Sequence, residues 1–393
     1  MSDHGFVPLS QPTIGDEEIN SVVDCLRSGW LTSGPKVLAF EAAFRARLGV
    51  GHAVAVNSAT AGLHLTLAAM GVGPGDEVIT TSLTWPSTVN VIELLGARPV
   101  FADVVPDALL IDVEDVARRI TDRTRAVVPV HYAGAPVDLD ALTSVIEGRP
   151  IAVLHDAAHA LGTVYKGREI GHQSLVERDV TVFSFHPIKN ITTGEGGMVI
   201  TQDDRLAERL RLLRFHGVTK DAWGRREGRG SPHYEVIEPG WKYNMLDLQA
   251  ALGIEQLAKL DRFNRDRAEL TARYAELLAE ISEVQPLGRP PYQHDHAWHL
   301  YVVQLDLGRL PIDRDRFMRE LAKEGVGTGL HFSPVHLHRY YAEKYGYRVG
   351  DLPVTEEAGE RILSLPLYPA MTYAQQDHVV SAVKRIISAK AAS

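Results

Sequence analysis

Lys189 lies in a glycine-rich loop between two apolar, β-branched runs at the two ends of residues 180–200. The first run ends at Ser184, and the loop continues through Gly194 to Gly197. This pattern predicts a strand, a tight loop and a second strand, with the lysine close to the ends of two buried strands. Partial burial lowers the pKa of a lysine and makes its amine a usable nucleophile. Taken alone, the pattern also fits an ordinary surface lysine in a glycine-rich hairpin.

An aspartate and a histidine follow the apolar run at residues 150–154. Asp156 comes at the end of that run, so its carboxylate is expected at the edge of the sheet. There it could cap a helix or pair with a cationic ligand. His159 follows one helical turn later and on the same side. A lone histidine is usually structural, but this spacing makes His159 a candidate site residue.

Two further features could hold the remaining parts of a ligand. Residues 57–62 join a predicted strand to a helix with small and hydroxyl residues in its first turn, where free backbone N–H groups favour a phosphate. An ordinary N-cap by Ser58 or Thr60 explains the same sequence. Trp85 stands where another strand gives way to a helix, at the edge where open α/β sheets hold ligands.

Together these four features match the requirements of pyridoxal 5′-phosphate. Its aldehyde needs a lysine, here Lys189, and its ring nitrogen needs a carboxylate, here Asp156, so that the ring can act as an electron sink. Trp85 would be a flat apolar partner for the ring, and the turn at residues 58–60 would bind the phosphate. Since no one feature is specific, the prediction depends on their joint occurrence. We expect no metal ion at this site.

Alternating strand and helix patterns predict an α/β fold with a mostly parallel sheet and helices on both faces. We predict a large domain over residues 1–260, with an extended N-terminal arm, and a smaller α+β domain over residues 261–393. A helix that starts after Asn244 is expected to run on toward residue 280 and to cross between the two domains.

Several segments have their own signatures. Residues 285–291 hold three prolines and a glycine and are the clearest candidate for a linker. Residues 298–305 and 326–332 are predicted strands. Residues 216–240 form a long irregular stretch, and such a stretch inside a compact domain is usually functional or disordered.

The composition, with 45% hydrophobic and 23% charged residues in a chain of 393, is that of a globular protein. A net charge of −9 without a block of lysine and arginine disfavours nucleic-acid binding. No apolar run is long enough for a membrane span, and the N-terminus lacks the pattern of a signal peptide. A single cysteine, Cys25, excludes an internal disulfide. We therefore expect a cytoplasmic protein with Cys25 packed in its core.

Over nearly its whole length the sequence resembles the sugar aminotransferases of the DegT/DnrJ/EryC1/StrS family. The resemblance rests on SGWLTSGP at 28–35, NSATA at 57–61, GDEVI at 75–79, DAAH at 156–159, SFHPIKNITTGEGG at 184–197 and YNMLD at 243–247. Within the family it resembles most the aminotransferases that make UDP-4-amino-4-deoxy-L-arabinose, through HYAGAP at 131–136, IKNIT at 188–192, HDHAWH at 294–299 and GTGLHF at 327–332. It departs from them at Thr193-Gly194, where they carry Cys-Ala, which weakens any inference about the exact substrate.

The resemblance implies the aspartate-aminotransferase fold of type I and a role for each motif residue. Lys189 would form the Schiff base with the cofactor and then move the proton between cofactor and substrate. Asp156 would pair with the pyridine nitrogen, and Trp85 would stack on the ring. His159, where many relatives have glutamine, would contact the ring-oxygen side.

The remaining implied contacts involve the phosphate and the sugar. The phosphate would be held by Ala59, Thr60 and Ser184. Asn244 would reach the phosphate of the neighbouring subunit, so the implied active unit is a homodimer. Trp30, Thr32 and His331 are weaker candidates for the sugar pocket.

The implied reaction is a two-step transamination. Glutamate, or glutamine in some relatives, converts the cofactor to its pyridoxamine form, which then aminates C4 of a UDP-4-keto-pentose or a dTDP-4-keto-6-deoxyhexose. The alternatives are amination of a 3-keto sugar, a dehydratase of the same fold, and a regulatory protein. The related dehydratases commonly have histidine at the position of Lys189, and a regulator would leave Lys189, Asp156 and Trp85 without a task.

Overall fold

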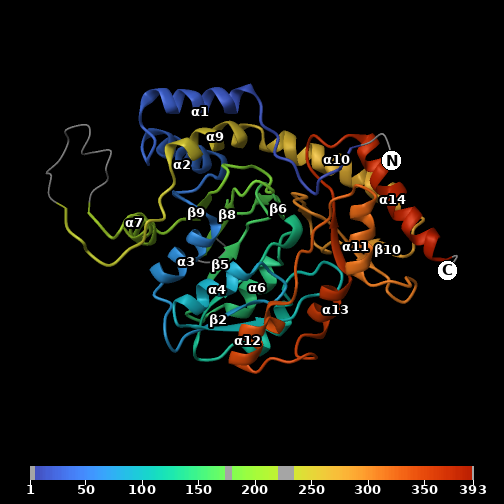
Figure 1. Ribbon diagram of the computed structural model, residues 1–393. Coiled ribbons are helices and arrows are strands. Elements are labelled where there is room, and N and C mark those ends of the chain that lie inside the picture. The colour runs from blue at the N-terminus through green and yellow to red at the C-terminus, as the bar shows by residue number, and fades with distance from the viewer. Residues whose placement is uncertain (1–4, 173–178, 220–233, 392–393) are drawn as a thin grey trace.

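The computed structural model describes residues 5–172, 179–219 and 234–391 (Figure 1). Its centre, within those ranges, is a seven-stranded sheet in the order β1-β9-β8-β5-β4-β2-β3. The strands are β1 His52–Val56, β2 Glu77–Thr81, β3 Arg98–Ala102, β4 Thr124–Val128, β5 Ala152–Asp156, β8 Val180–Ser184 and β9 Gly197–Thr201. Neighbouring strands are parallel except where β9 pairs with β1 and β8. The predicted α/β fold with a mostly parallel sheet is confirmed.

Side chains along each strand alternate between two faces, and helices bury both. On β1, Val54 and Val56 pack in one core, whereas Ala53 and Ala55 pack in another. The first face is covered by α3 Ala59–Ala69, α4 Pro86–Leu94 and α7 Asp204–Leu213. The second is covered by α2 Pro35–Leu48, α5 Val113–Arg119, α6 Leu139–Ile146 and α9 Asp247–Ala258. Helix α1, Asp16–Ser28, packs on the outside of α9 (Figure 1).

The C-terminal part of the chain builds a second core beside the sheet. Its strands form an antiparallel sheet in the order β10-β12-β13, made of Val284–Pro286, Tyr301–Leu305 and Ile362–Leu365. Its helices are α10 Leu260–Leu278, α11 Arg314–Lys323 and α14 Tyr373–Ala391. Val7 of the N-terminal arm is buried in this core and bridges Val326, so both ends of the chain lie on this side (Figure 1).

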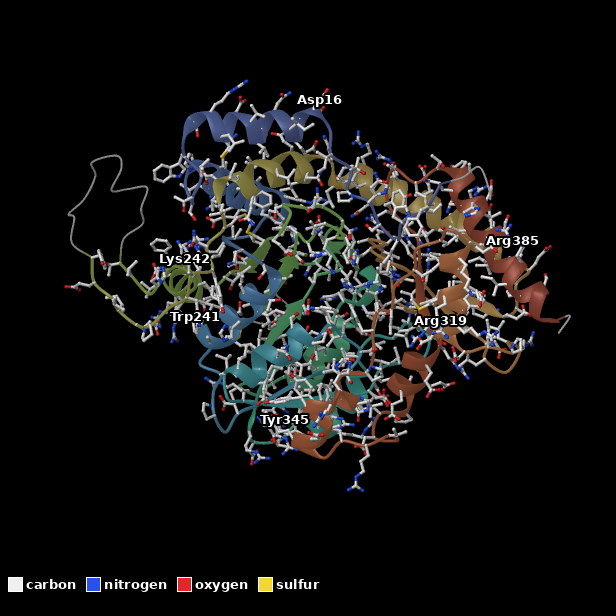
Figure 2. The ribbon with its side chains drawn as sticks, in the orientation of Figure 1. Asp16, Trp241, Lys242, Arg319, Tyr345 and Arg385 are labelled. Carbon is white, nitrogen blue, oxygen red and sulfur yellow. The ribbon has the colours of Figure 1, made fainter. Side chains whose placement is uncertain are left out.

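A small third sheet and two short helices complete the described fold. The sheet, β11-β6-β7, consists of His294–Asp295, Val164–Tyr165 and Arg168–Glu169. Helices α12 Arg339–Tyr345 and α13 Pro353–Arg361 return to the large sheet, where Tyr341 packs with Val89 and Phe101. Figure 2 labels Tyr345 on α12, and its hydroxyl donates to Glu93 Oε2 of α4 at 2.5 Å. Residues after 260 thus contribute both to the second core and to contacts with the helices and strands of the large sheet. The predicted domain boundary at 260/261 stays a prediction.

Three expectations about local structure are wrong. The first two residues of the expected linker, 285 and 286, belong to β10 and pair with β12. The helix expected to run to residue 280 is interrupted at Lys259, whose ψ of −5° departs from the helical value of about −42°. The strand expected from Trp298 starts only at Tyr301, because Trp298 has a φ of 49°, which extended backbone cannot adopt.

The strand expected over residues 326–332 is also wrong. The segment makes only isolated bridges, at Val326 and Gly329, and its last three residues line a cavity. Of the irregular stretch 216–240, residues 220–233 lie outside the described residues. Cys25 is buried in the core, as predicted. Among the helices that the structure describes, none has the length and apolar character needed to cross a membrane.

Candidate active site

A cavity of about 440 Å³ lies where β5 and β8 end, at Asp156 and Ser184. This is the edge of the sheet at which the sequence predicts a ligand. Eight of the predicted site residues line it: Ala59, Thr60, Trp85, Asp156, His159, Ser184, Lys189 and His331. The fold therefore gathers side chains from five separate segments of the chain around one space.

The first turn of α3 forms one wall of this cavity. Ser58 caps the helix, and its hydroxyl accepts from Ala61 N at 3.1 Å, as the simpler reading of this segment predicts. Ala59 and Thr60 nevertheless line the cavity. The first N–H groups of a helix have no intrahelical acceptor and lie at its positive end. This wall is therefore suited to an anion such as a phosphate.

Gly197, the first residue of β9, lets this helix end approach the sheet. A Cβ at this position would stand 2.8 Å from Ala59 N and 2.9 Å from Phe183 O. We expect Gly197→Ala to displace the start of α3, to lower the melting temperature and to weaken phosphate binding. Calorimetry and titration with pyridoxal phosphate would measure both effects. Gly73→Ala is the matched control, since its Cβ would meet nothing closer than 4.0 Å. Equal behaviour of the two variants would contradict the expectation.

Lys189 projects into the cavity from the loop between β8 and β9, as predicted. The backbone N–H of Lys189 donates to His186 O at 2.8 Å and closes a turn. Gly194, farther along the loop, has a φ of 77°, which glycine adopts readily. Burial lowers the pKa of the Lys189 amine to about 8, and the charge of Asp156 opposes that shift. A pKa of about 8 leaves about a tenth of the amine neutral at pH 7. The neutral amine is the form that a nucleophile or a base requires.

Asp156 is buried at the end of β5 and held by two donors. Thr88 Oγ1 donates to Oδ2 at 2.7 Å, and Ala158 N donates to Oδ1 at 3.2 Å. Burial raises the pKa of the Asp156 carboxyl, whereas these two hydrogen bonds and the charge of Lys189 favour its ionised form. A buried carboxylate with fixed donors and a cationic neighbour can serve as the partner of a ring N–H.

His159 and Trp85 provide the polar and the flat apolar surfaces. His159 Nδ1 accepts from Ala133 N at 3.2 Å, so in the neutral ring Nε2 carries the proton and can donate. Burial, with the charges of Lys189 and His331, lowers the pKa of His159 well below its usual value, so the ring is neutral. Trp85 precedes α4, and 62% of its side chain is exposed at the cavity wall. A large exposed indole at this place can serve as a stacking surface for an aromatic ring.

The other three predicted residues do not line this cavity. Trp30, Thr32 and Asn244 gather instead around Ser33 and Asp247. Asn244 Nδ2 donates to Ser33 Oγ at 2.6 Å, and Asp247 N donates to Thr32 O at 3.3 Å. Trp30 Nε1 donates to Ser33 O at 3.1 Å. These residues form a second polar cluster beside α1 and α2, away from the cavity, so their predicted roles stay predictions.

Two side chains that contact Asp156 and Lys189 are not among the site residues predicted from the sequence. Thr88 orients Asp156, and a hydroxyl at the third position of a predicted helix gives no signal of that role. His299 Nε2 lies 3.4 Å from Lys189 Nζ, although 110 residues separate the two in sequence. The HDHAWH motif was the one available signal for His299.

Comparison with known proteins decides the family. Residues 12–384 match the DegT/DnrJ/EryC1/StrS aminotransferase family. The chain belongs to this family. The resemblance to this family and the predicted type I fold are confirmed.

Three solved structures show how closely the architecture agrees. Spr1654 of Streptococcus pneumoniae, described as a sugar aminotransferase and solved in its PMP form, is 32% identical with a TM-score of 0.89, over 98% of this chain and 99% of that one. TlmJ, an aminotransferase of Streptoalloteichus hindustanus, is 35% identical with a TM-score of 0.88 over the same shares. PseC of Helicobacter pylori, an aminotransferase involved in the biosynthesis of pseudoaminic acid, is 29% identical with a TM-score of 0.89, over 98% of this chain and 100% of that one.

The family depends on pyridoxal phosphate, and the described residues fit that cofactor. Spr1654 has been solved in both PMP and PLP forms. In this chain Lys189, Asp156 and Trp85 face one cavity with the α3 terminus, and Gly197 leaves room for a close approach of the helix to the sheet. Bound there, the cofactor supplies an electron sink for the carbon that reacts.

Proposed function

We propose that the protein transfers an amino group from glutamate to C4 of a nucleotide-linked 4-keto sugar. The observation that carries this proposal is that the Lys189 amine and the Asp156 carboxylate face the same cavity. A UDP-4-keto-pentose and a dTDP-4-keto-6-deoxyhexose are the two candidate substrates. Their sugar parts differ by one methyl group, and a hydrophobic pocket discriminates only weakly between ligands that differ by one such group.

Each residue around the cavity has a separate role in the proposed reaction. Lys189 accepts and returns a proton at Nζ, which its lowered pKa permits near neutral pH. Asp156 holds a proton on the ring nitrogen through a carboxylate fixed by Thr88. His159 donates from Nε2 to an oxygen acceptor, and Trp85 shields one face of the ring from water.

Two experiments test the proposal in sequence. Purified protein mixed with pyridoxal phosphate should show a visible absorption band, and Lys189→Ala should abolish it. If the wild-type protein gives no such band, the proposal fails. Single-turnover amination of a panel of keto sugar nucleotides by the pyridoxamine form then tests the position. Reaction of a 3-keto sugar, with no 4-keto sugar consumed, would overturn the assignment to C4.

The same panel distinguishes the competing functions. A dehydratase of this fold would eliminate water from its substrate without consuming glutamate, and the lysine at position 189 disfavours it. A regulatory protein would bind the cofactor weakly or not at all and would aminate nothing. Both outcomes are read directly from product analysis by mass spectrometry.

We further propose that the active unit is a homodimer in which Asn244 completes the phosphate site of the neighbouring subunit. If so, co-expression of Lys189→Ala and Asn244→Ala chains should restore activity. A mixed dimer would hold one site with both native residues and one site with neither, so about a quarter of all sites would recover. Activity no higher than the sum of the two separate variants would show that Asn244 acts within its own chain.

A further inference from the structure

His299 stands directly against the reactive lysine. Its ring is 2% exposed, and Nε2 lies 3.4 Å from Lys189 Nζ, at the long end of hydrogen-bond range. The ring centroid is 4.3 Å from that of His159. Among the described residues its other nitrogen, Nδ1, has no hydrogen-bond partner. A buried imidazole left half-satisfied is costly, so its contact with Lys189 calls for a function.

The backbone around His299 is fixed from three sides. Asn190, next to the reactive lysine, donates from Nδ2 to Ala297 O at 2.7 Å. Ala297 N donates to Gly134 O at 3.1 Å. The approach is tight, because a Cβ on Gly134 would lie 2.9 Å from Trp298 N. The HYAGAP and HDHAWH motifs are therefore packed against each other and against the lysine loop.

A buried arginine makes the third contact that fixes the backbone around His299. Arg267 of α10 is 1% exposed, and its Nη1 donates to Trp298 O at 3.3 Å, His299 O at 3.2 Å and Leu367 O at 3.1 Å. Arg267 Nε has no hydrogen-bond partner among the described residues, so the bonds from Nη1 to these carbonyls are what ties the guanidinium to residues 298 and 299. The C-terminal unit thereby holds the His299 ring rigidly beside the lysine.

We propose that His299 is a positioning residue for Lys189, whose Nζ donates a hydrogen bond to His299 Nε2 and is thereby aimed into the cavity. This rests on the proposed function of Lys189. A long contact of this kind is expected to tighten once a ligand is bound. The acceptor also stabilises the ammonium form, so it limits how far burial depresses the pKa of Lys189.

Other groups around the amine cannot take this role. Asp156 faces Lys189 from β5 as a charge, and it is already held by Thr88. His159 uses Nδ1 to accept from Ala133, and His331 Nδ1 lies 2.8 Å from Ser364 Oγ. His186, on the lysine's own loop, faces Glu195 at 4.0 Å, and Arg267 meets His299 only through its carbonyl.

The pH dependence of Lys189 labelling in the cofactor-free full chain tests the proposal. A neutral aryl electrophile such as fluorodinitrobenzene reacts only with the unprotonated amine, and peptide mass spectrometry isolates the Lys189 signal. We expect an inflection near 8 in the wild type. His299→Phe, which keeps the volume but removes the acceptor, should lower it by about one unit or more. His299→Gln, which retains an acceptor oxygen, should not lower it.

A control and a second measurement keep the test independent of folding. His378→Gln removes another buried ring, one that contacts Glu324 O at 2.8 Å, and should leave the Lys189 inflection unchanged. In wild-type protein, ¹⁵N spectra taken about one unit below the inflection should show His299 Nε2 unprotonated, and Lys189→Ala should shift that resonance. A wild-type inflection in His299→Phe, a fall in His299→Gln, or a protonated Nε2 would each overturn the proposal. The cofactor absorption band of the wild type would still report separately on the proposed function.

Discussion

Replacing Lys189 with alanine should slow amination by the pyridoxamine form between about a hundredfold and ten-thousandfold, the usual range for losing a general acid–base group. The amine is held in the cavity with its pKa lowered to about 8, and no other described side chain there combines that position with that pKa. Single-turnover mixing with the best 4-keto substrate measures the loss. Lys323→Ala, on the exposed face of α11, is the matched control and should react like the wild type.

The pH profile gives this prediction a signature that misfolding cannot imitate. Below the pKa of about 8 the amine is protonated and cannot accept a proton, so the wild-type rate should fall as the pH drops through that value. In Lys189→Ala the inflection should vanish. Methylamine should partly restore the rate, with an inflection set by its own pKa. An inflection near 8 that survives in Lys189→Ala would show that another group is the base.

The placement of the central residues could be predicted because it depends on local rules. A continuous apolar run that ends on Asp156 fixes that carboxylate at the sheet edge, and the run ending at Ser184 fixes the lysine loop at the same edge. Trp85 follows from the same rule at the end of β2 and the loop after it. These arguments need only the period of a strand and the order of strand, loop and helix.

The parts that could not be predicted depend on long-range contacts. His299 is held beside Lys189 by hydrogen bonds from Asn190 to Ala297 O and from Arg267 to His299 O. These bonds join residues far apart in the sequence, so no local pattern predicts them. The left-handed φ of Trp298 interrupts an alternation that reads as a continuous strand. The cluster around Asn244 does not line the cavity of its own chain, and its role in the site of a neighbouring subunit stays a prediction.

Replacing Asp156 with asparagine should separate activity from stability. We expect amination to fall at least about a hundredfold, because the neutral amide cannot hold a proton on the ring nitrogen with the strength of a carboxylate. Burial raises the pKa of Asp156 in the folded chain above that of an unfolded aspartate. The ionised carboxylate therefore costs folding free energy at every pH above the unfolded pKa, and this includes neutral pH. The cofactor-free variant should therefore be no less stable than the wild type in thermal unfolding at neutral pH.

Thr88→Val provides the graded comparison for Asp156→Asn. It removes the hydroxyl that donates to Asp156 Oδ2 at 2.7 Å but leaves the carboxylate in place. A hydrogen bond to a charged group is worth about 1.5–3 kcal/mol, so its loss should raise the pKa of Asp156 by about one to two units. Amination should then fall at a higher pH than in the wild type as the pH is lowered, and recover as the pH rises, because the carboxylate ionises again. Asp156→Asn should show no such recovery. If Thr88→Val instead lost as much activity as Asp156→Asn at every pH, the hydroxyl would have a direct role beyond tuning the carboxylate.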